Sequence, residues 1–525
     1  MKPQKRRMTD GRRGAGELGD AVVAMEILLP RALPRFQLAR IIDASMGRHP
    51  GRSGRRLADG GAVALLATLS AACDAPLEFS PAEIAAHHML EGAPRGFFLG
   101  AATSAYQIEG GARTDWTTWE AGRYSDGTPH VAGGASAARA ADSWNLWRDD
   151  VAALGQLGAN MYRLGIEWGR LEPAEGAWDA AAAARYREMF AALRAAHVEP
   201  MVTLYHFTLP PWVAARGGWD WPGAPGALAA FAGHAGAAFG DLVDWWITLN
   251  EPNVYVAKGY LAGQWPPSVS DPARAVRALA AFERAHGLMA EALRANDRRD
   301  ADGDGHATRI GIAHNVRVFD PRSWSPIDHV AANVADDFYN QQFLDAVARG
   351  RVHAKLPRVL EIDEPFPALV GSFDFLGLNY YTRELTVGHL FGAKHYEPTT
   401  APDRPTSDMG WELYPEGLYR VLKRYGTSPW PLFVTENGVA DARGDLRPDF
   451  LRAHIYAVDR ARREGVNVIG YLHWSLIDNF EWSHGYEGRF GLFTIDFAHD
   501  PALTRRPTPA VETFREAARA LEAPR

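Results

Sequence analysis

From Gly96 onward the chain repeats one pattern: a short apolar run, a few polar residues, and a longer stretch with apolar residues at helical spacing. Short apolar runs bounded by polar residues predict buried strands, and the stretches between them predict helices. The eight predicted strands are 97–105, 159–168, 199–207, 244–252, 309–316, 373–381, 431–438 and 468–476. The clearest predicted helices are 146–157, 180–196, 273–296 and 450–464.

This alternation predicts an α/β fold. Strands separated by helices pair in parallel, because a crossover helix returns the chain to the same end of the sheet. Eight such units close into a (β/α)8 barrel, which can hold more than 250 residues in one domain. A doubly wound open sheet is the competing arrangement, but no GxGxxG follows the first predicted strand. We therefore predict a single barrel domain over residues 95–525.

Residues 1–94 differ from the rest, since they carry Arg, Gly and Pro without sustained periodicity. We expect a poorly structured N-terminal extension. Within it, an arginine-rich stretch precedes the apolar run 62–72, and Cys73 follows at once. That order is typical of a bacterial lipoprotein signal, which predicts a lipid anchor at Cys73 and an exported protein. A disordered leader on a cytoplasmic protein is the alternative, and the sequence leaves both open.

Composition limits the classes of partner. The chain is 47% hydrophobic and 23% charged, which is ordinary for a globular protein. A net charge of −7 argues against nucleic acid as a partner, because phosphate backbones require a basic surface. The sequence has no apolar run long enough for a transmembrane helix. The seventeen Trp are either core residues or stacking surfaces for flat ligands such as sugars.

The sequence gives little support for a metal site. The single cysteine excludes a cysteine-based metal site. The stretch Asp300-x-Asp302-x-Asp304-Gly305 matches the opening of a calcium loop, but its twelfth position is Gly311 instead of Glu, and a predicted strand follows. We interpret it as a solvated turn and predict no metal and no organic cofactor.

Polar side chains stand at the carboxyl ends of the predicted strands. In a barrel these ends meet at one mouth, where active sites are built. The residues are Gln107, Glu109, Glu167, His206, Asn250, Glu251, Asn379, Tyr381, Glu436 and Trp474. Their common position predicts one polar pocket.

Two of these residues are glutamates in matched contexts, Glu251 in TLNEPN and Glu436 in VTENG. A single glutamate at a strand end is more often a surface or capping residue, but a matched pair favours catalysis. Cleavage of a glycosidic bond requires one protonated and one ionised carboxyl group, so their environments must separate the two pKa values. Arg163, in the second predicted strand, can hold one of the two in its ionised form.

A family resemblance becomes clear from the order of motifs. They are GAATSAYQIEG, YRLGIEWGR, TLYHF, TLNEPN, FLGLNYYT, TENG and HWSLIDNFEW followed by RFGLFTIDF. Through them, residues 95 to 520 resemble glycoside hydrolase family 1, the β-glucosidase family. The resemblance implies a retaining exo-β-glycosidase that acts on terminal β-D-glucosyl, β-galactosyl or β-fucosyl residues. A transglycosylase would share every catalytic residue. A non-catalytic sugar-binding barrel is a third reading, whose signature would be loss of either glutamate.

The resemblance also implies a role for each site residue. Glu251 would be the general acid/base and Glu436 the nucleophile, with Arg163 and Tyr381 bonded to the nucleophile. The sugar-binding residues implied in the same way are Gln107, His206, Asn250, Trp474, Glu481 and Trp482. Members that act on 6-phosphorylated sugars usually carry Ser in place of Glu481, so an unphosphorylated glycoside is expected.

Two departures from the family pattern bear on the preference for the sugar. His206-Phe207-Thr208 stands where His-Trp-Asp is frequent, and YRLGIEW (162–168) stands where YRFSISW is commoner. Neither departure changes the catalytic pair. The aglycone site is expected on loops such as 385–410, which carry no motif.

Overall fold

The computed structural model describes residues 77–390 and 396–522. Eight parallel strands close into a barrel in the order β1-β13-β12-β9-β5-β4-β3-β2. They are β1 Phe98–Ala102, β2 Met161–Gly165, β3 Glu199–Tyr205, β4 Trp245–Asn250, β5 Arg309–Asn315, β9 Leu376–Asn379, β12 Leu432–Asn437 and β13 Val468–Trp474. Each lies within one of the eight predicted strands, so the predicted (β/α)8 fold is confirmed.

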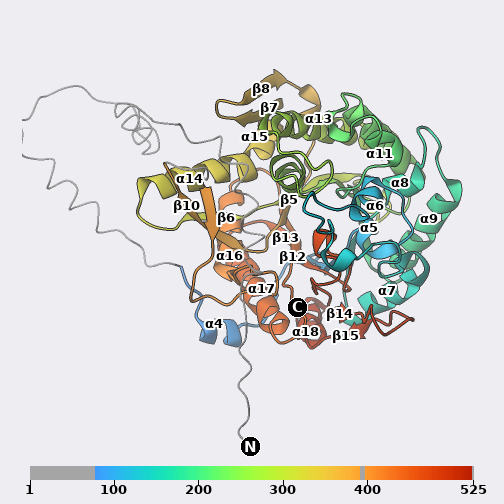
Figure 1. The fold of residues 1–525 in the computed structure, drawn as a ribbon. Helices are drawn as coiled ribbons and strands as arrows, with labels where there is room; N and C mark the ends of the chain where they lie inside the picture. The colour runs from blue at the N-terminus through green and yellow to red at the C-terminus, as the bar shows by residue number, and fades with distance from the viewer. Residues whose placement is uncertain (1–76, 391–395, 523–525) are drawn as a thin grey trace, which may run out of the picture.

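Helices surround the barrel strands (Figure 1). They are α5 Ala105–Glu109, α6 Asp115–Glu120, α7 Ser143–Leu157, α8 Trp168–Leu171, α9 Ala180–Ala195, α10 Pro211–Ala214, α11 Ala224–Phe239, α12 Pro252–Tyr255, α13 Pro272–Asn296, α14 Pro326–Asp336, α15 Gln342–Arg349, α16 Pro415–Tyr425, α17 Arg447–Arg463 and α18 Ala510–Glu522. Local sequence fixes several starts. Asp179 and Asp271, for example, accept backbone N–H groups in the first turns of α9 and α13. No helix among the described residues is long and apolar enough to cross a membrane.

Three small sheets lie outside the barrel. They are the sheet of β6 Val318–Pro321, β10 Arg383–Gly388 and β11 Tyr396–Thr399, the hairpin of β7 Arg351–Leu356 and β8 Leu360–Pro365, and the pair of β14 Phe493–Thr494 and β15 Arg506–Pro507. β6 follows barrel strand β5, and β10 follows barrel strand β9. The first sheet therefore extends the wall of the barrel mouth beside those two strands.

The inside of the barrel is filled by side chains rather than open. One buried cluster includes Met161, Met201, Trp245, Phe375 and Phe433, contributed by or directly next to barrel strands. This packing is typical of eight-stranded parallel barrels, whose interior is a core. Between its described strands, the barrel thus holds a packed core and no internal channel.

Strand register changes where the polar residues begin. The pairing of β4 with β5 shifts between Ile247 and Asn250, and the pairing of β12 with β9 shifts between Val434 and Glu436. Such irregularities bend a strand and re-aim its side chains, and they are common next to active sites. The shifts fall at the ends of the two strands that lead to the glutamate pair.

Residues 77–94 pack against the barrel, which differs from the expectation of a poorly structured extension for this stretch. They include the short helix α4 Pro81–Ala86. The N–H of Phe79 donates to Glu416 on α16 over 2.9 Å, and the N–H of Leu90 donates to Asp459 on α17 over 2.7 Å. These buried carboxylates hold the stretch in place. The predicted signal, with Cys73, lies outside the described residues.

Candidate active site

A pocket opens at the carboxyl ends of the barrel strands and brings together most of the predicted site residues. Those that line it are His206, Asn250, Glu251, Tyr381, Glu436, Trp474, Glu481 and Trp482. The other two residues to which the resemblance gives a role lie directly behind the lining. Arg163 bonds Glu436, and Gln107 donates to Glu481 over 3.2 Å. Glu109, which was also predicted at the pocket, does not line it and instead accepts from Arg170 over 3.0 Å.

Glu436, on β12, is buried and held by two donors. The guanidinium of fully buried Arg163 bonds its Oε1, and the hydroxyl of Tyr381 donates to its Oε2 over 2.6 Å. Burial raises the pKa of Glu436, while the charge of Arg163 and the Tyr381 hydrogen bond oppose that rise. Both partners favour the ionised form, as expected for a charge-assisted pair.

Close packing explains the glycine of the TENG motif. A Cβ atom added to Gly438 would lie 1.8 Å from the carbonyl oxygen of Trp474. Any side chain at this position would collide with β13, so only glycine lets the end of β12 approach the end of β13 this closely. That approach brings Glu436 and Trp474 to the same pocket.

Glu251 follows β4 directly and has a different set of neighbours. Its Oε1 accepts hydrogen bonds from the side-chain amides of Asn315 and Asn379, each over 2.8 Å. Burial and the charge of Glu436 raise the pKa of Glu251 to about 8, and the two amide donors oppose this. Burial and the charge of Glu436 thus favour the protonated form of Glu251.

The backbone of Glu251 is in the left-handed region, with φ of 44°. Residues other than glycine rarely adopt this conformation, and it costs about 1 kcal/mol. Its N–H donates to the carbonyl of Ala313 on β5 over 2.8 Å, which helps to fix the turn. The turn directs Glu251 into the pocket before Pro252 begins α12.

Asn250 links the two glutamates. Its Oδ1 accepts from Arg163 over 2.6 Å and from Asn379 over 3.2 Å. Arg163 also bonds Glu436, and Asn379 also bonds Glu251. The acid pair is therefore joined through one continuous set of amide and guanidinium groups.

The amide nitrogen of Asn250 lies 3.1 Å from Nε2 of His206. Because Oδ1 of Asn250 already accepts two bonds, its amide donates, and Nε2 must be unprotonated. Burial lowers the pKa of His206 well below its usual value, so the ring is neutral with its proton on Nδ1. That buried Nδ1 has no hydrogen-bond partner among the described residues. It is a donor available to a ligand.

Indole rings form an aromatic wall around His206. Trp474 and Trp482 each stack on its ring, with centroids 5.9 Å apart in both pairs. Phe207 packs edge-on against Trp482 at 5.2 Å. Part of the tryptophan content of the chain thus lies at the pocket, where flat apolar faces meet polar groups.

The two departures from the family pattern contact each other. The hydroxyl of Thr208 donates to both carboxyl oxygens of Glu167, over 3.1 and 3.0 Å. Both side chains are buried, and neither lines the pocket, whereas Phe207 does. The departures at residues 167 and 208 therefore lie behind the wall and contact each other, and Phe207 is the departure that lines the pocket.

Three residues at the glutamate pair had no predicted role. Asn379 was predicted at a strand end, but its bond to Glu251 was not, and neither Asn315 nor Tyr339 stood out. Tyr339 lies on the π-helix η5 Asp337–Gln341 and donates to Asn315 over 2.9 Å. The one available signal was the position of Asn315 at the end of the predicted strand 309–316.

Charged residues on the rim are paired. Arg317 bonds Glu384 over 3.0 Å, and Arg383 bonds Glu412 over 2.8 Å. Arg317, Glu384 and Arg383 line the pocket beyond the glutamate pair. They stand on or next to the small sheet of β6 and β10, which gives the outer pocket a polar wall.

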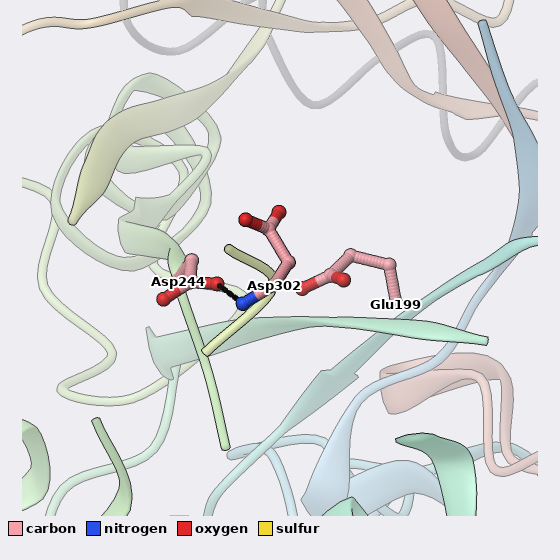
Figure 2. Close-up of side chains that lie close together, drawn as sticks. All are labelled: Glu199, Asp244 and Asp302. Atoms are coloured by element: carbon pink, nitrogen blue, oxygen red, sulfur yellow. Dashed lines mark hydrogen bonds between the residues drawn. The ribbon is translucent and has the colours of Figure 1, made fainter. Parts of the chain in front are cut away.

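An acidic cluster lies at the opposite end of the barrel, where Glu199 begins β3 and Asp244 precedes β4. Figure 2 shows both with Asp302, whose N–H donates to Asp244 over 2.9 Å. Arg194 bonds both Glu199 and Asp244, so a guanidinium already supplies positive charge there. The stretch 300–305 is an exposed turn whose backbone N–H groups donate to Asp300. The absence of a metal requirement stays a prediction.

Comparison with known proteins gives a consistent result. The sequence model of glycosyl hydrolase family 1 matches residues 89–521. A β-galactosidase from Pyrococcus woesei is 32% identical over 81% of this chain and 96% of its own length. A bifunctional β-D-glucosidase/β-D-fucosidase from Bifidobacterium breve is 32% identical over 77% of this chain and 94% of its own. The structure of a family 1 β-glucosidase from Thermotoga maritima superposes with a TM-score of 0.73, at 30% identity, over 83% of this chain and 99% of its own.

The barrel, its paired carboxyl groups and these similarities define a glycoside hydrolase of the β-glucosidase type. The chain belongs to glycosyl hydrolase family 1. The resemblance seen in its motifs is thereby confirmed.

Proposed function

We propose that this enzyme is a retaining exo-β-glycosidase that hydrolyses terminal, non-reducing β-D-glucosyl residues or close epimers of them. One observation carries the proposal: the partners of the two buried glutamates at the pocket favour opposite protonation states. Glu436 is bonded by a guanidinium and a phenol, which favour its carboxylate. Glu251 has only neutral amide donors and faces the charge of Glu436, which favours its protonated form.

In the first step, a carboxylate oxygen of Glu436 attacks the anomeric carbon. The bond from that carbon to the glycosidic oxygen breaks, and the proton of Glu251 passes to this oxygen. The aglycone leaves as a neutral alcohol, the sugar is esterified to Glu436, and Glu251 is left ionised. Since the charge of Glu436 raised the pKa of Glu251, its loss in the ester lowers that pKa.

In the second step, water attacks the anomeric carbon and gives a proton to Glu251. The ester bond breaks, and Glu436 returns as a carboxylate. Two successive inversions at the anomeric carbon retain its β configuration. Glu251 acts first as an acid and then as a base, and both roles are favoured by the change in charge at Glu436.

The sugar would lie against the aromatic wall, with Trp474 as its stacking surface and Nδ1 of His206 as a hydroxyl donor. Asn250 is proposed to contact the 2-hydroxyl. Glu481 and Trp482 line the pocket, and Gln107 orients Glu481 through a hydrogen bond of 3.2 Å. Gln107 is thus proposed to support the binding of the sugar through Glu481. A carboxyl group at position 481 disfavours a phosphorylated sugar.

A panel of three glycones tests the substrate. The measurement compares the turnover of p-nitrophenyl β-D-glucoside, β-D-galactoside and β-D-fucoside at pH 5 to 8. We expect turnover of at least one of them. The named activities of the relatives include all three sugars, so each glycone is a candidate substrate. Free sugar released in equal amount to nitrophenol indicates hydrolysis, whereas a deficit indicates transfer to an acceptor. No turnover of any of the three would overturn the proposal.

The pH dependence of kcat/KM is expected to be bell-shaped. Activity requires protonated Glu251, so the rate falls as pH rises through about 8, the raised pKa of Glu251. Activity also requires ionised Glu436, so the rate falls as the pH drops through the pKa of Glu436. Burial raises that pKa above the ordinary glutamate value of 4.5, so the acid limb lies above 4.5. The pair titrates as a unit, so the two limbs report both groups together. An alkaline limb that persists in Glu251→Gln would contradict the assignment.

A further inference from the structure

Two neutral amides converge on one oxygen of Glu251. Asn315, the last residue of β5, and Asn379, the last residue of β9, both donate to Oε1 over 2.8 Å. A carboxyl oxygen has two lone-pair directions, and both are used by these N–H groups. Oε1 is thereby placed as the acceptor oxygen of the acid.

The orientation of each amide is fixed by a hydroxyl group. Tyr339 donates to Oδ1 of Asn315 over 2.9 Å, and Thr435 donates to Oδ1 of Asn379 over 2.7 Å. A phenol or alcohol that donates to the amide oxygen leaves the NH2 group to face Oε1. If either amide turned over, its oxygen would face Oε1 instead.

The hydroxyl of Tyr339 is itself held in place. The side-chain amide of Asn253 donates to the backbone carbonyls of both Asn315 and Tyr339, over 2.8 and 2.9 Å. The guanidinium of Arg317 lies over the Tyr339 ring, 5.5 Å from its centroid. The phenol and the amide that it orients are thus fixed relative to each other by backbone as well as side-chain contacts.

We propose that Tyr339 and Thr435 are positioning residues that act through Asn315 and Asn379 to confine the transferable proton of Glu251 to Oε2. The inference rests on the proposed function, because it concerns the acid of that reaction. A protonated oxygen is a poorer acceptor than a carbonyl oxygen, so two N–H donors on Oε1 place the proton on the other oxygen.

This placement matters when the glycosidic bond breaks. The proton leaves Oε2 for the glycosidic oxygen as the bond from that oxygen to the anomeric carbon is lost, and Oε1 keeps both amide bonds as Glu251 becomes ionised. With an amide turned over, the proton would instead sit on Oε1 and bond the amide oxygen. It would then be held away from the leaving group.

The test is the variant Tyr339→Phe, with two aryl glucosides that differ in their need for acid. Phenyl β-D-glucoside has a poor leaving group that must be protonated, whereas 2,4-dinitrophenyl β-D-glucoside leaves without a proton. General acid catalysis contributes roughly 100-fold or more, and partial loss of its geometry is expected to cost about 10-fold in kcat/KM for the phenyl substrate. The dinitrophenyl substrate is expected to change less than about twofold, because kcat/KM reports only the first step.

Matched variants separate positioning from general damage. Tyr396→Phe removes the same atom from a buried tyrosine on β11 whose hydroxyl has no hydrogen-bond partner among the described residues, so both rates should be kept. Thr435→Val removes the second orienting hydroxyl and should reproduce the selective loss.

Each outcome decides the inference. A selective loss on the phenyl substrate in both Tyr339→Phe and Thr435→Val supports it. An equal loss on both substrates indicates a merely structural role and overturns the inference. The inference is also overturned if neither Tyr339→Phe nor Thr435→Val loses activity on either substrate. A wild-type enzyme that turns over neither these glucosides nor the corresponding galactosides and fucosides overturns the proposed function, and the inference with it.

Discussion

Replacing Glu436 by Gln is expected to lower the turnover of aryl β-glycosides by about 10⁴-fold or more, whatever the leaving group. The amide keeps the shape of the side chain but removes the nucleophile. Loss is equal across leaving groups because no covalent intermediate can form with any of them. The measurement is kcat/KM for the phenyl and dinitrophenyl glucosides, with the intact mass of wild-type enzyme after reaction with a 2-fluoro glycoside as a second readout of the ester.

A matched control exists for the loss of a buried carboxyl group. Glu283, on α13, is buried and does not line the pocket, and it accepts the N–H of His353 over 2.7 Å. Glu283→Gln should keep activity. Azide added to Glu436→Gly should give a glycosyl azide of the configuration opposite to the wild-type product, because azide fills the space of the nucleophile. A product of the wild-type configuration would contradict the role of Glu436.

Replacing Glu251 by Ala should give a loss that depends on the leaving group. We expect kcat/KM for phenyl β-D-glucoside to fall by roughly 10²- to 10⁴-fold, the range of general acid catalysis. The dinitrophenyl substrate should lose far less in kcat/KM, since its leaving group needs no proton. This contrast follows from the buried position of Glu251, where its raised pKa keeps the proton that a poor leaving group requires.

Azide also distinguishes this variant. In Glu251→Ala the glycosyl ester on Glu436 still forms, so azide should attack it and give a product of the wild-type configuration. Added azide should therefore accelerate turnover of the dinitrophenyl substrate. Undiminished activity of Glu251→Ala on the phenyl substrate would show that another group is the acid.

The barrel could be predicted because each of its strands is buried on both faces and therefore appears as a continuous apolar run. Strands outside the barrel gave no such signal. β8 is largely exposed and carries Glu361, Asp363 and Glu364, so its sequence resembles a loop. β7 and β8 form because they pair with each other, and that pairing depends on partners that local sequence does not specify.

Some residues of the site could likewise be predicted from the sequence, and others could not. Glu251 and Glu436 stood out because ionisable groups at the ends of apolar runs are unusual, and Arg163 followed as a cation in the second predicted strand. Asn315 and Tyr339 carry no charge, and Tyr339 comes from a helix rather than a barrel strand, so nothing in their local sequence indicates the bond between them. The contact between Thr208 and Glu167 joins the segments that follow β3 and β2, 41 positions apart, and no local pattern indicates it.

At Glu251 the left-handed backbone lowers the stability of the fold, whereas the side chain is needed for the proposed catalysis. The φ of 44° at this residue makes the folded state less favourable, and glycine would relieve that backbone strain. A search for stabilising substitutions that scores only resistance to unfolding would therefore select glycine at residue 251 and discard the proton donor. Engineering of this enzyme for heat tolerance should hold this residue fixed and look for gains elsewhere in the chain.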